Sequence, residues 1–455
     1  MGAETIFALS SAAGRAGIAV VRVSGPDAEQ AVLALTQRPL PEPRRASLRD
    51  LYLPASPQGG DGYDPAETAG KQGRKIDSAL VLWFPGPDSA TGEDVAEFHV
   101  HGGRAIVDAV LEALGGVAGL RPADRGEFTR RAVENGKLDL TQAEGLADLI
   151  DAETDTQRRQ ALDQYGGALR ELCEDWRARL IRLAAWAEAA IDFSDEELDA
   201  DLAARTTEGI RGLLGEIRAR LADGRRGEIT RDGFQLTVIG PPNAGKSSLL
   251  NALARREVAI VSETPGTTRD VVEVRLDIGG YLVIAADTAG LREAGEAIEA
   301  EGVRRALARA ESADLVLLLL DGTADDPYAG VPANSVRDAL VVWNKRDLPW
   351  PAAREGLTIS VATGEGMDRL FATLEAEVRA RLQSRSGEAV AVTRARHRRA
   401  LEEAADSLAR ALEQQEAELA AEDLRLALRA IGRITGRVDI EELLDVVFRD
   451  FCIGK

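Results

Sequence analysis

Hydrophobic and polar residues follow two different periods along the chain. In the first 137 residues, short apolar stretches at 18–23 and 78–83 have the character of strands, and residues 105–114 show helical spacing. This alternation predicts a small α/β domain. Residues 54–75 are rich in Gly and Pro and have no apolar period, so we expect a surface loop there and assign it no function.

Amphipathic helices are expected on both sides of a second α/β region. Apolar residues recur every three or four positions from 138 to about 227, and again from 393 to 451. Between these blocks, residues 234–382 alternate strand-like runs with helices, a pattern typical of a parallel sheet with crossover helices. The simplest fold is therefore a multidomain α/β plus α protein in which an inserted α/β domain interrupts a helical one. Two unrelated helical domains are the alternative. The expected segments are 1–137, 138–231, 232–388 and 389–455.

Length and composition favour a multidomain protein and argue against a disulfide-rich or membrane-spanning one. A length of 455 residues corresponds to about three domains of roughly 150 residues each. The net charge of −20 opposes non-specific binding of nucleic acid, and Cys173 and Cys452 are too few for a disulfide framework. The longest apolar run, residues 315–320, is far shorter than the roughly 20 residues that cross a bilayer. With no targeting segment evident, we expect a cytoplasmic protein and no membrane contact.

Residues 240–247 (GPPNAGKS) fit the phosphate-binding loop, which follows an expected strand at 235–239 and opens a helix at 248–254. Backbone N–H groups of such a loop cradle phosphates, Lys246 reaches the β- and γ-phosphates, and Ser247 ligates Mg²⁺. The residues expected to contact nucleotide here are Asn243, Ala244, Gly245, Lys246, Ser247 and Ser248.

Three further segments complete a guanine-nucleotide site. The run Asp287, Thr288, Ala289, Gly290 ends a strand at 281–286, where it approaches the metal and the γ-phosphate. The run Asn344, Lys345, Arg346, Asp347 follows a strand at 339–343, and its last carboxylate is expected to accept hydrogen bonds from guanine. The run Ser360, Val361, Ala362 is placed to donate a backbone N–H to guanine O6. Together these segments favour GTP over other purine nucleotides.

A switch segment is expected between the first two elements. It supplies Thr268 as a second Mg²⁺ ligand, although a capped turn is the other interpretation of this stretch. The residue after Gly290 is Leu291, so the Gln that orients water in Ras is missing. Asn243 is a candidate ligand for a monovalent cation that supplies the charge of an arginine finger, or it is an ordinary loop residue.

Several motifs outside this site carry a family resemblance. They are 91–97 (TGEDVAE) with 101–103 (HGG), 125–129 (RGEFT), 135–144 (NGKLDLTQAE), 190–193 (AIDF) and the terminal 451–455 (FCIGK). With the nucleotide motifs, the chain resembles the tRNA-modification GTPase family MnmE, also called TrmE, almost from end to end.

The resemblance implies a fold, partners and cofactors. It implies an N-terminal domain like folate-binding aminomethyltransferases, through which the family dimerises, and a GTPase domain inserted in a helical one. With an FAD-containing partner, MnmG (GidA), in a heterotetramer or larger complex, the family installs a carboxymethylaminomethyl-type group on C5 of the wobble uridine (position 34) of tRNA. The implied one-carbon source is 5-formyltetrahydrofolate or methylenetetrahydrofolate.

The resemblance also assigns residues to roles. Arg22, Glu97, Lys137 and Lys455 would line the folate site. Potassium-dependent dimerisation of the GTPase domain would use Asn243, Ser262, Thr264 and Thr267, and Glu299 would act indirectly on the attacking water. The nucleotide-contacting stretch would comprise Ser262, Glu263, Thr264, Pro265, Gly266, Thr267 and Thr268. Pro265 replaces a common Ala and Ser262 a frequent Thr, and we expect potassium binding to survive both.

Three further features are candidate functional residues: Cys452, the histidine pair and a basic segment. Cys452 is either a nucleophile or a buried apolar anchor. His99 and His101 share a strand face but lack a third metal ligand nearby, and the basic residues 394–399 either touch tRNA or form a solvated helix face. Two rival functions are a ribosome-assembly GTPase such as Era or Der, for which residues 383–455 lack the expected GXXG loop, and a stand-alone folate-dependent aminomethyltransferase.

Overall fold

The computed structural model describes most of the chain in two compact units. The described residues are 4–53, 73–192, 200–223, 225–256, 258–260, 273–287, 313–329, 331, 338–351, 353–383, 392–438, 444, 447–448, 451 and 454. One unit comprises Met1–Ala147 with Gly432–Lys455, and the other Asp148–Ile431. None of the helices within these described ranges is long and apolar enough to cross a membrane.

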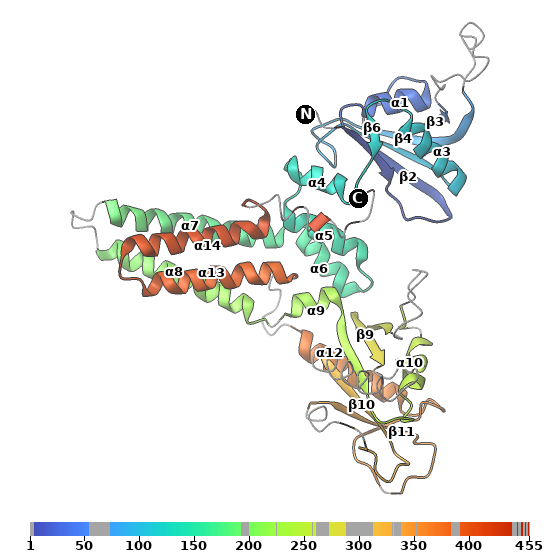
Figure 1. Cartoon of the computed structure of the whole chain (residues 1–455), viewed down its shortest axis with the longest axis vertical. Helices are drawn as coiled ribbons and strands as arrows, with labels where there is room; N and C mark the ends of the chain where they lie inside the picture. The colour runs from blue at the N-terminus through green and yellow to red at the C-terminus, as the bar shows by residue number, and fades with distance from the viewer. Residues whose placement is uncertain are drawn as a thin grey trace, which may run out of the picture. The chain divides into compact units, whose positions relative to one another are not determined.

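The first unit contains a six-stranded sheet in the order β3-β4-β5-β2-β1-β6 (Figure 1). All neighbouring strands are antiparallel except β1 and β6. The strands are β1 (Thr5–Leu9), β2 (Ala16–Ser24), β3 (Ser47–Tyr52), β4 (Lys75–Phe84), β5 (Val95–Gly102) and β6 (Leu120–Pro122). The strands expected at 18–23 and 78–83 are thus confirmed as parts of β2 and β4. Lys75, which we had included in the loop, begins β4 because it pairs with Tyr52 and its ammonium lies 2.7 Å from Asp50.

The two faces of this sheet differ. Helices α1 (Ala28–Thr36) and α3 (Arg104–Gly115) cover the inner face, where the alternate residues Val21, Val81 and Phe98 are fully buried. On the outer face, Phe128 of α4 (Glu127–Glu134) packs against Ile6 and Ala8 of β1. We call the remaining outer face of β2, β3, β4 and β5 the open face.

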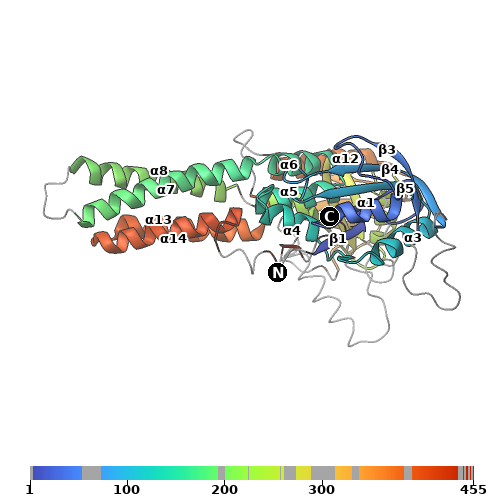
Figure 2. The same ribbon diagram turned by 90° about the horizontal axis from the view of Figure 1, so that it is seen from above.

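The second unit contains a helical bundle that is interrupted in sequence. Its long helices are α7 (Ala168–Asp192), α8 (Ala200–Leu221), α13 (Ala395–Glu413) and α14 (Ala417–Thr435), preceded by α5 (Leu140–Asp151) and α6 (Asp155–Tyr165). Figures 1 and 2 show the long helices side by side, and α8 packs against α13. Arg425 of α14 reaches Glu188 of α7 at 2.8 Å. The two helical blocks therefore form one bundle, which excludes two unrelated helical domains.

A second six-stranded sheet lies between α8 and α13 in the chain, in the order β12-β11-β10-β7-β9-β8. Only the β8–β9 pair is antiparallel. The strands are β7 (Phe234–Ile239), β8 (Glu273–Ile278), β9 (Tyr281–Asp287), β10 (Leu315–Asp321), β11 (Leu340–Asn344) and β12 (Leu357–Thr358), and the helices are α10 (Lys246–Ala254) and α12 (Met367–Leu382). The parallel sheet that the sequence predicted is confirmed.

Two carboxylates, Asp148 and Glu228, hold the points where the chain leaves and re-enters the bundle. Asp148 Oδ1 accepts from Arg231 at the end of α9 (Arg226–Asp232), at 3.1 Å, and from Arg394 before α13, at 2.6 Å. Glu228 Oε1 accepts from Arg398 at 2.8 Å. Ion pairs therefore tie the outgoing and returning segments to each other and to α5.

Candidate functional site

The phosphate loop lies at the carboxyl end of β7, where the chain turns into α10. Gly240 and Gly245 have φ angles of 153° and 100°, a region that favours glycine, and Asn243 adopts φ 61°. At Gly240, a Cβ would lie 2.1 Å from the Leu319 carbonyl oxygen, so β7 and β10 approach too closely there for a side chain. A sharply turned loop that leads into a helix N-terminus is an arrangement that binds phosphate.

Lys246 lies inside this loop. Its Nζ donates to the carbonyl oxygens of Gly240 and Pro241, both at 2.9 Å, and the residue is only 8% exposed. Ser247, the next residue, is exposed in the first turn of α10. Of the two side chains that the sequence assigned to phosphate and Mg²⁺, Lys246 is therefore buried against the loop and Ser247 is exposed at the start of α10.

Asp287 ends β9 beside the phosphate loop. Its backbone pairs in register with Val238, two residues before Gly240. The parallel pairing of β7 and β9 thus brings together two motifs that are separated by more than 40 positions in the sequence. Thr288, Ala289 and Gly290 lie outside the described residues.

Asn344 joins the phosphate loop to the 360–362 run. Its Nδ2 donates to the Ala244 carbonyl oxygen at 2.8 Å, and its Oδ1 accepts from the Val361 N–H at 3.1 Å. The residue is 4% exposed, and a Cβ on Gly245 would lie 2.5 Å from its Nδ2. One buried amide therefore sets the distance between two loops.

Asp347 is oriented by the same loop. Its Oδ1 accepts a 2.6 Å hydrogen bond from the Ser360 hydroxyl, whose oxygen accepts from the Thr363 N–H at 3.1 Å. The Arg346 N–H donates to the Ile359 carbonyl oxygen at 3.0 Å. The structure thus brings residues of 344–347 and 360–362 together at one edge of the sheet.

The sequence analysis missed Asp321. Lys345 Nζ donates to its Oδ2 at 2.5 Å, and its Oδ1 accepts from the Thr323 hydroxyl and N–H. Burial opposes ionisation of Asp321, but the hydrogen bonds from Lys345 and Thr323 outweigh it and hold its pKa below the ordinary value. The available signal was the aspartate that closes the apolar run 315–320 on a strand next to β11.

Many of the assigned residues lie outside the described part of the chain, so their roles stay predictions. They are Ser262, Glu263, Thr264, Pro265, Gly266, Thr267, Thr268, Glu299, Cys452 and Lys455.

In the first unit, Arg22 and Glu97 lie together on the open face. Arg22 donates from Nε and Nη2 to Glu97 Oε1 at 3.0 and 2.9 Å, and His99 Nε2 lies 3.2 Å from Glu97 Oε2. The Arg22 guanidinium lies 5.9 Å from the centre of the Phe128 ring. The result is a half-buried carboxylate held between two nitrogen groups and bordered by an aromatic ring.

His101 lies on the same strand but has a different partner. Its Nδ1 is 2.9 Å from Asp77 Oδ1 on β4, whereas His99 faces Glu97. The two histidines are thus engaged by separate carboxylates.

Lys137 follows α4 and packs against the loop that precedes β5. A Cβ on Gly92 would lie 2.9 Å from Asn135 Cβ and 3.4 Å from Lys137 Cγ. Asn135 Nδ2 donates to the Thr91 carbonyl oxygen at 2.7 Å. The motifs at 91–97 and 135–144, distant in sequence, are therefore fitted directly to each other.

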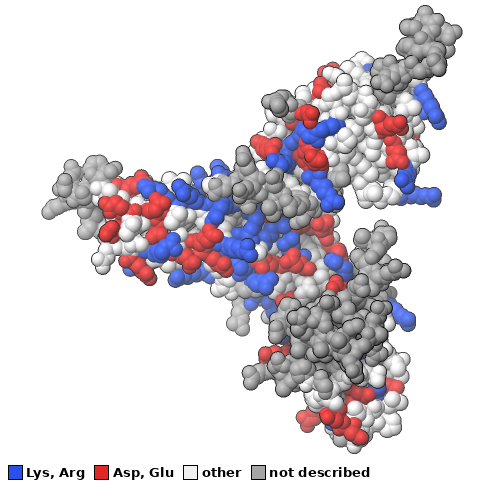
Figure 3. All heavy atoms as spheres, viewed as in Figure 1, with Lys and Arg blue, Asp and Glu red and all other residues white. Residues whose placement is uncertain are grey.

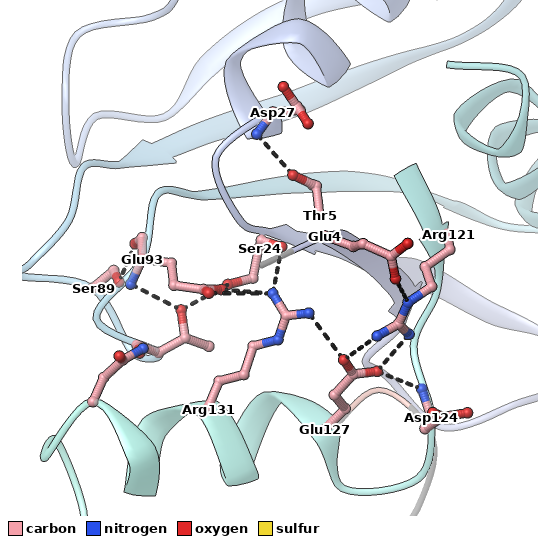
Figure 4. A network of polar contacts seen from close by, with 12 residues as sticks. Glu4, Thr5, Ser24, Asp27, Ser89, Glu93, Arg121, Asp124, Glu127 and Arg131 are labelled. Carbon is pink, nitrogen blue, oxygen red and sulfur yellow. Dashed lines mark hydrogen bonds and ion pairs between the residues drawn. The ribbon is translucent and has the colours of Figure 1, made fainter. Parts of the chain in front are cut away.

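Behind this contact lies a network of charged side chains (Figure 4). Arg131 of α4 donates to Glu93 Oε2 at 3.0 Å and to Glu127 Oε1 at 2.9 Å, and Arg121 of β6 donates to Glu127 Oε1 at 2.6 Å. Burial opposes ionisation of Glu127, but hydrogen bonds from Arg121, the Asp124 N–H and Arg131 outweigh it and lower its pKa to about 2. The network fixes α4, and with it the position of Lys137.

The C-terminal end of the chain packs on the same unit. The Ser10 hydroxyl donates to the Gly454 carbonyl oxygen at 2.9 Å, and a Cβ on Gly454 would lie 2.0 Å from the Leu9 carbonyl oxygen. A Cβ on Gly126 would lie 2.9 Å from Phe451 Cβ. The terminal motif therefore lies against β1 and the start of α4.

Two family models match the chain in succession. The model described as "GTP-binding protein TrmE N-terminus" matches residues 5–137, and the model described as "MnmE helical domain" matches residues 140–452. The chain belongs to the MnmE (TrmE) family.

Relatives of the MnmE family match over the whole chain. The protein of Rhodospirillum rubrum, named tRNA modification GTPase MnmE, is 56% identical and covers 100% of both chains. The protein of Parvibaculum lavamentivorans, of the same name, is 57% identical over 99% of this chain and 100% of its own. The solved G domain of the T. maritima FeoB iron transporter aligns with 33% of this chain and 99% of its own at 22% identity, with a TM-score of 0.26.

The basic residues of 394–399 in this MnmE-family chain differ in their environment: some form ion pairs and others are exposed. Arg394 pairs with Asp148 and Arg398 with Glu228, so these two guanidinium groups serve the bundle. Arg399 is exposed, and Figure 3 shows basic and acidic side chains interspersed along the helices. For Arg394 and Arg398 the structure therefore differs from a solvated helix face, because their side chains are only 19% and 18% exposed and pair with carboxylates.

Proposed function

We propose that this chain binds and hydrolyses GTP and acts in tRNA modification. The observation that carries the proposal is the Asn344 side chain, which bonds the phosphate loop and the 360–362 run at once and so fixes the span between them. Beside it, the Asp347 carboxylate is suited to accept from the N1–H and 2-amino groups of guanine, a donor pair that adenine lacks.

Magnesium is the cation that fits the residues at the phosphate loop. The hydroxyl of Ser247 is an oxygen ligand of the kind that Mg²⁺ prefers. Asp287, whose backbone pairs with Val238 at the end of β9, and Thr268 would complete the set. Bound Mg²⁺ would neutralise charge on the phosphates. Lys246 supplies a second positive charge there, so the protein's own contribution is positioning and charge stabilisation.

For hydrolysis, we propose a potassium-activated site. Asn243, whose backbone is held at φ 61° in the phosphate loop, would provide one oxygen ligand, with Ser262, Thr264 and Thr267 as the others. Glu299 would act on the attacking water through an intermediary, since Leu291 replaces the Gln used by Ras.

The test is the GTPase rate of the full chain in KCl and in NaCl at equal ionic strength. Strong stimulation by potassium supports this mechanism, and Asn243→Ala should abolish the stimulation while leaving the sodium rate in place. Equal rates in both salts would remove the potassium mechanism, and no hydrolysis in either would overturn the GTPase proposal.

We further propose that the first unit binds a tetrahydrofolate, 5-formyl or methylene, as the one-carbon source. Arg22 and Lys137 are suited to pair with the glutamate tail, and Glu97 to accept from the pterin amino group, with Lys455 as the fourth residue. The product would be a carboxymethylaminomethyl-type group on C5 of the wobble uridine at position 34, made with an FAD-containing MnmG partner. Cys452 would be a candidate nucleophile in this step.

An apolar row on the open face supports a homodimer through the first unit. Leu48 and Leu80 are register partners on β3 and β4, and with Ile18 of β2 they are 70%, 41% and 61% exposed. Such exposed apolar side chains are suited to pair with a second copy. Leu48→Asp should raise the dissociation constant of the dimer in sedimentation; an unchanged dimer would place the interface elsewhere.

We infer that residues 1–137 form a folate domain, that 138–231 and 389–455 form the two parts of a helical domain, and that 232–388 form the inserted GTPase domain of a cytoplasmic protein. Deletion of the gene should remove the modified wobble nucleoside from tRNA digests. Normal tRNA in the deletion strain would contradict the modification role and favour a ribosome-assembly GTPase.

A further inference from the structure

An ion pair lies between the base-reading motif and the phosphate loop. Lys345 has φ 65°, unusual for a residue with a side chain, and its Nζ lies 2.5 Å from Asp321 Oδ2. The side chains are 31% and 17% exposed, so water only partly screens the pair. None of the roles proposed above uses Asp321.

The carboxylate end of this pair is rigidly held. Asp321 Oδ1 accepts from the Thr323 hydroxyl at 2.6 Å and from its N–H at 2.9 Å. The neighbouring Gly322 N–H donates to the Asn344 carbonyl oxygen at 3.1 Å. Asp321 therefore cannot follow Lys345 into other rotamers at low cost.

The backbone of Lys345 is also held in place. The Trp350 indole N–H donates to the Lys345 carbonyl oxygen at 2.9 Å. A Cβ on Gly322 would lie 2.2 Å from the Trp350 ring, so this ring packs directly on the Asp321 loop. Both ends of the lysine side chain are thus fixed, one at the backbone and one at the ammonium.

The strand order determines where the Asp321–Lys345 ion pair lies relative to a bound nucleotide. β10 lies between β11 and β7, and Asp321 is the register partner of Asn344. A nucleotide whose phosphates occupy the loop after β7 and whose base reaches Asp347 after β11 has to cross the end of β10. The Lys345 side chain, stretched from β11 to β10, runs along that crossing.

We propose that Asp321 is a positioning residue for the guanine nucleotide: it holds Lys345 extended so that the four methylenes of this lysine form a platform against the purine ring. The pair also neutralises a carboxylate that would otherwise repel the phosphates. The inference rests on the proposed function, because it assumes that the site takes a guanine nucleotide.

The first experiment measures binding of a fluorescent GDP analogue to the full chain and to two variants. Asp321→Asn should weaken binding about tenfold, because a neutral amide holds the ammonium less strongly than a carboxylate does. Asp325→Asn, an exposed aspartate four residues away, should bind like the wild type. Binding by Asp321→Asn that equals or exceeds that of the wild type overturns the inference, whereas no binding by the wild type overturns the proposed function and the inference with it.

A second set of variants separates positioning from general damage. On a Lys345→Met background, which keeps the apolar chain without its ammonium, Asp321→Asn should cause no further loss; independent losses would overturn the inference. Thr323→Val keeps the Asp321 charge but removes one bond that orients it, and should weaken binding about twofold to threefold. The ratio of GDP to IDP affinity should stay constant in Asp321→Asn, because a methylene platform does not read the 2-amino group, and a changed ratio would count against it.

Discussion

The edge of the second sheet that carries residues 240–247, 344–347 and 360–362, here called the nucleotide edge, and the open face of the first sheet are built in opposite ways. At the nucleotide edge, each functional side chain follows directly on the end of a parallel strand, and backbone geometry at Gly240 and Gly245 does much of the positioning. On the open face, Arg22 and Glu97 stand in the middle of two antiparallel strands, and their neighbourhood depends on register. The residues of a site at strand ends are contiguous in the sequence and form recognisable motifs. The residues of a site on a sheet face are dispersed along the sequence.

The largest expected effect concerns base choice at the nucleotide edge. Asp347→Asn replaces an acceptor with a donor towards guanine N1–H, so GTP affinity should fall about a thousandfold while xanthosine triphosphate gains. Competition binding with the two nucleotides measures this. Asp368→Asn, whose carboxylate is 95% exposed, is the matched control and should leave both affinities unchanged. Intact guanine preference in Asp347→Asn would mean that another group reads the base.

Gly245→Ala tests how far backbone geometry sets the same edge. The new methyl group would meet Asn344 Nδ2 at 2.5 Å and displace the amide that ties the loops, so nucleotide affinity should fall about a hundredfold. Gly356 has φ 112° with nothing within 4 Å of its Cβ position, so Gly356→Ala carries backbone strain alone. Calorimetric titration with GDP should show near wild-type affinity for Gly356→Ala, and equal losses in both would assign the effect to strain.

In the first unit, the sharpest test concerns the charged network of Figure 4. Glu127→Gln leaves Arg121 and Arg131 without their shared carboxylate and should destabilise the unit by about 2 kcal/mol at pH 7. Hydrogen exchange of α4 peptides in increasing urea measures this. Glu134→Gln on the same helix, with a side chain 48% exposed, should change the stability by less than about 0.5 kcal/mol.

The stability difference between the wild type and Glu127→Gln should depend on pH. The folded pKa of Glu127, about 2, lies below its ordinary value of 4.5, so its stabilisation is fully present above pH 4.5 and is lost as the pH falls towards 2. The difference between wild type and Glu127→Gln should therefore shrink over that window. A difference that persists undiminished at pH 2 would assign the effect to packing.

The smallest expected effect is on the open face. Glu97→Gln keeps the shape of the side chain but weakens its bonds to Arg22 and His99, so tetrahydrofolate affinity should fall about fivefold in equilibrium dialysis. Asp108→Asn, on the exposed side of α3 with a side chain 64% exposed, should not alter it. An unchanged affinity in Glu97→Gln would remove Glu97 from the folate site.

Much of the nucleotide edge was predictable because its rules are local. A strand followed by GPPNAGKS and a helix predicts a phosphate loop, and the order of the motifs along the chain predicts which edge they share. Asp321 was missed because its only local signal is an aspartate at the end of an apolar strand. Its role depends on β10 lying beside β11, which is a property of the sheet order.

On the first sheet, the sequence alone supplied little beyond the family resemblance. The motifs at 91–97 and 135–144 have no visible reason to occur together until Asn135 is seen to bond Thr91 and Gly92 to pack on Lys137. Arg131, which shares no motif with Glu93, bonds both Glu93 and Glu127 because α4 crosses the outer face.

By itself, the sequence determined the family, the strands and helices with strong periodicity, and the chemistry of the nucleotide motifs, since these depend on residues close together in the chain. The tertiary structure decided that the two helical blocks form one bundle, that Asp148 joins their connections, and that Asp321 holds Lys345. Each of these depends on packing between distant segments, where burial and register, and not local propensity, choose the partner.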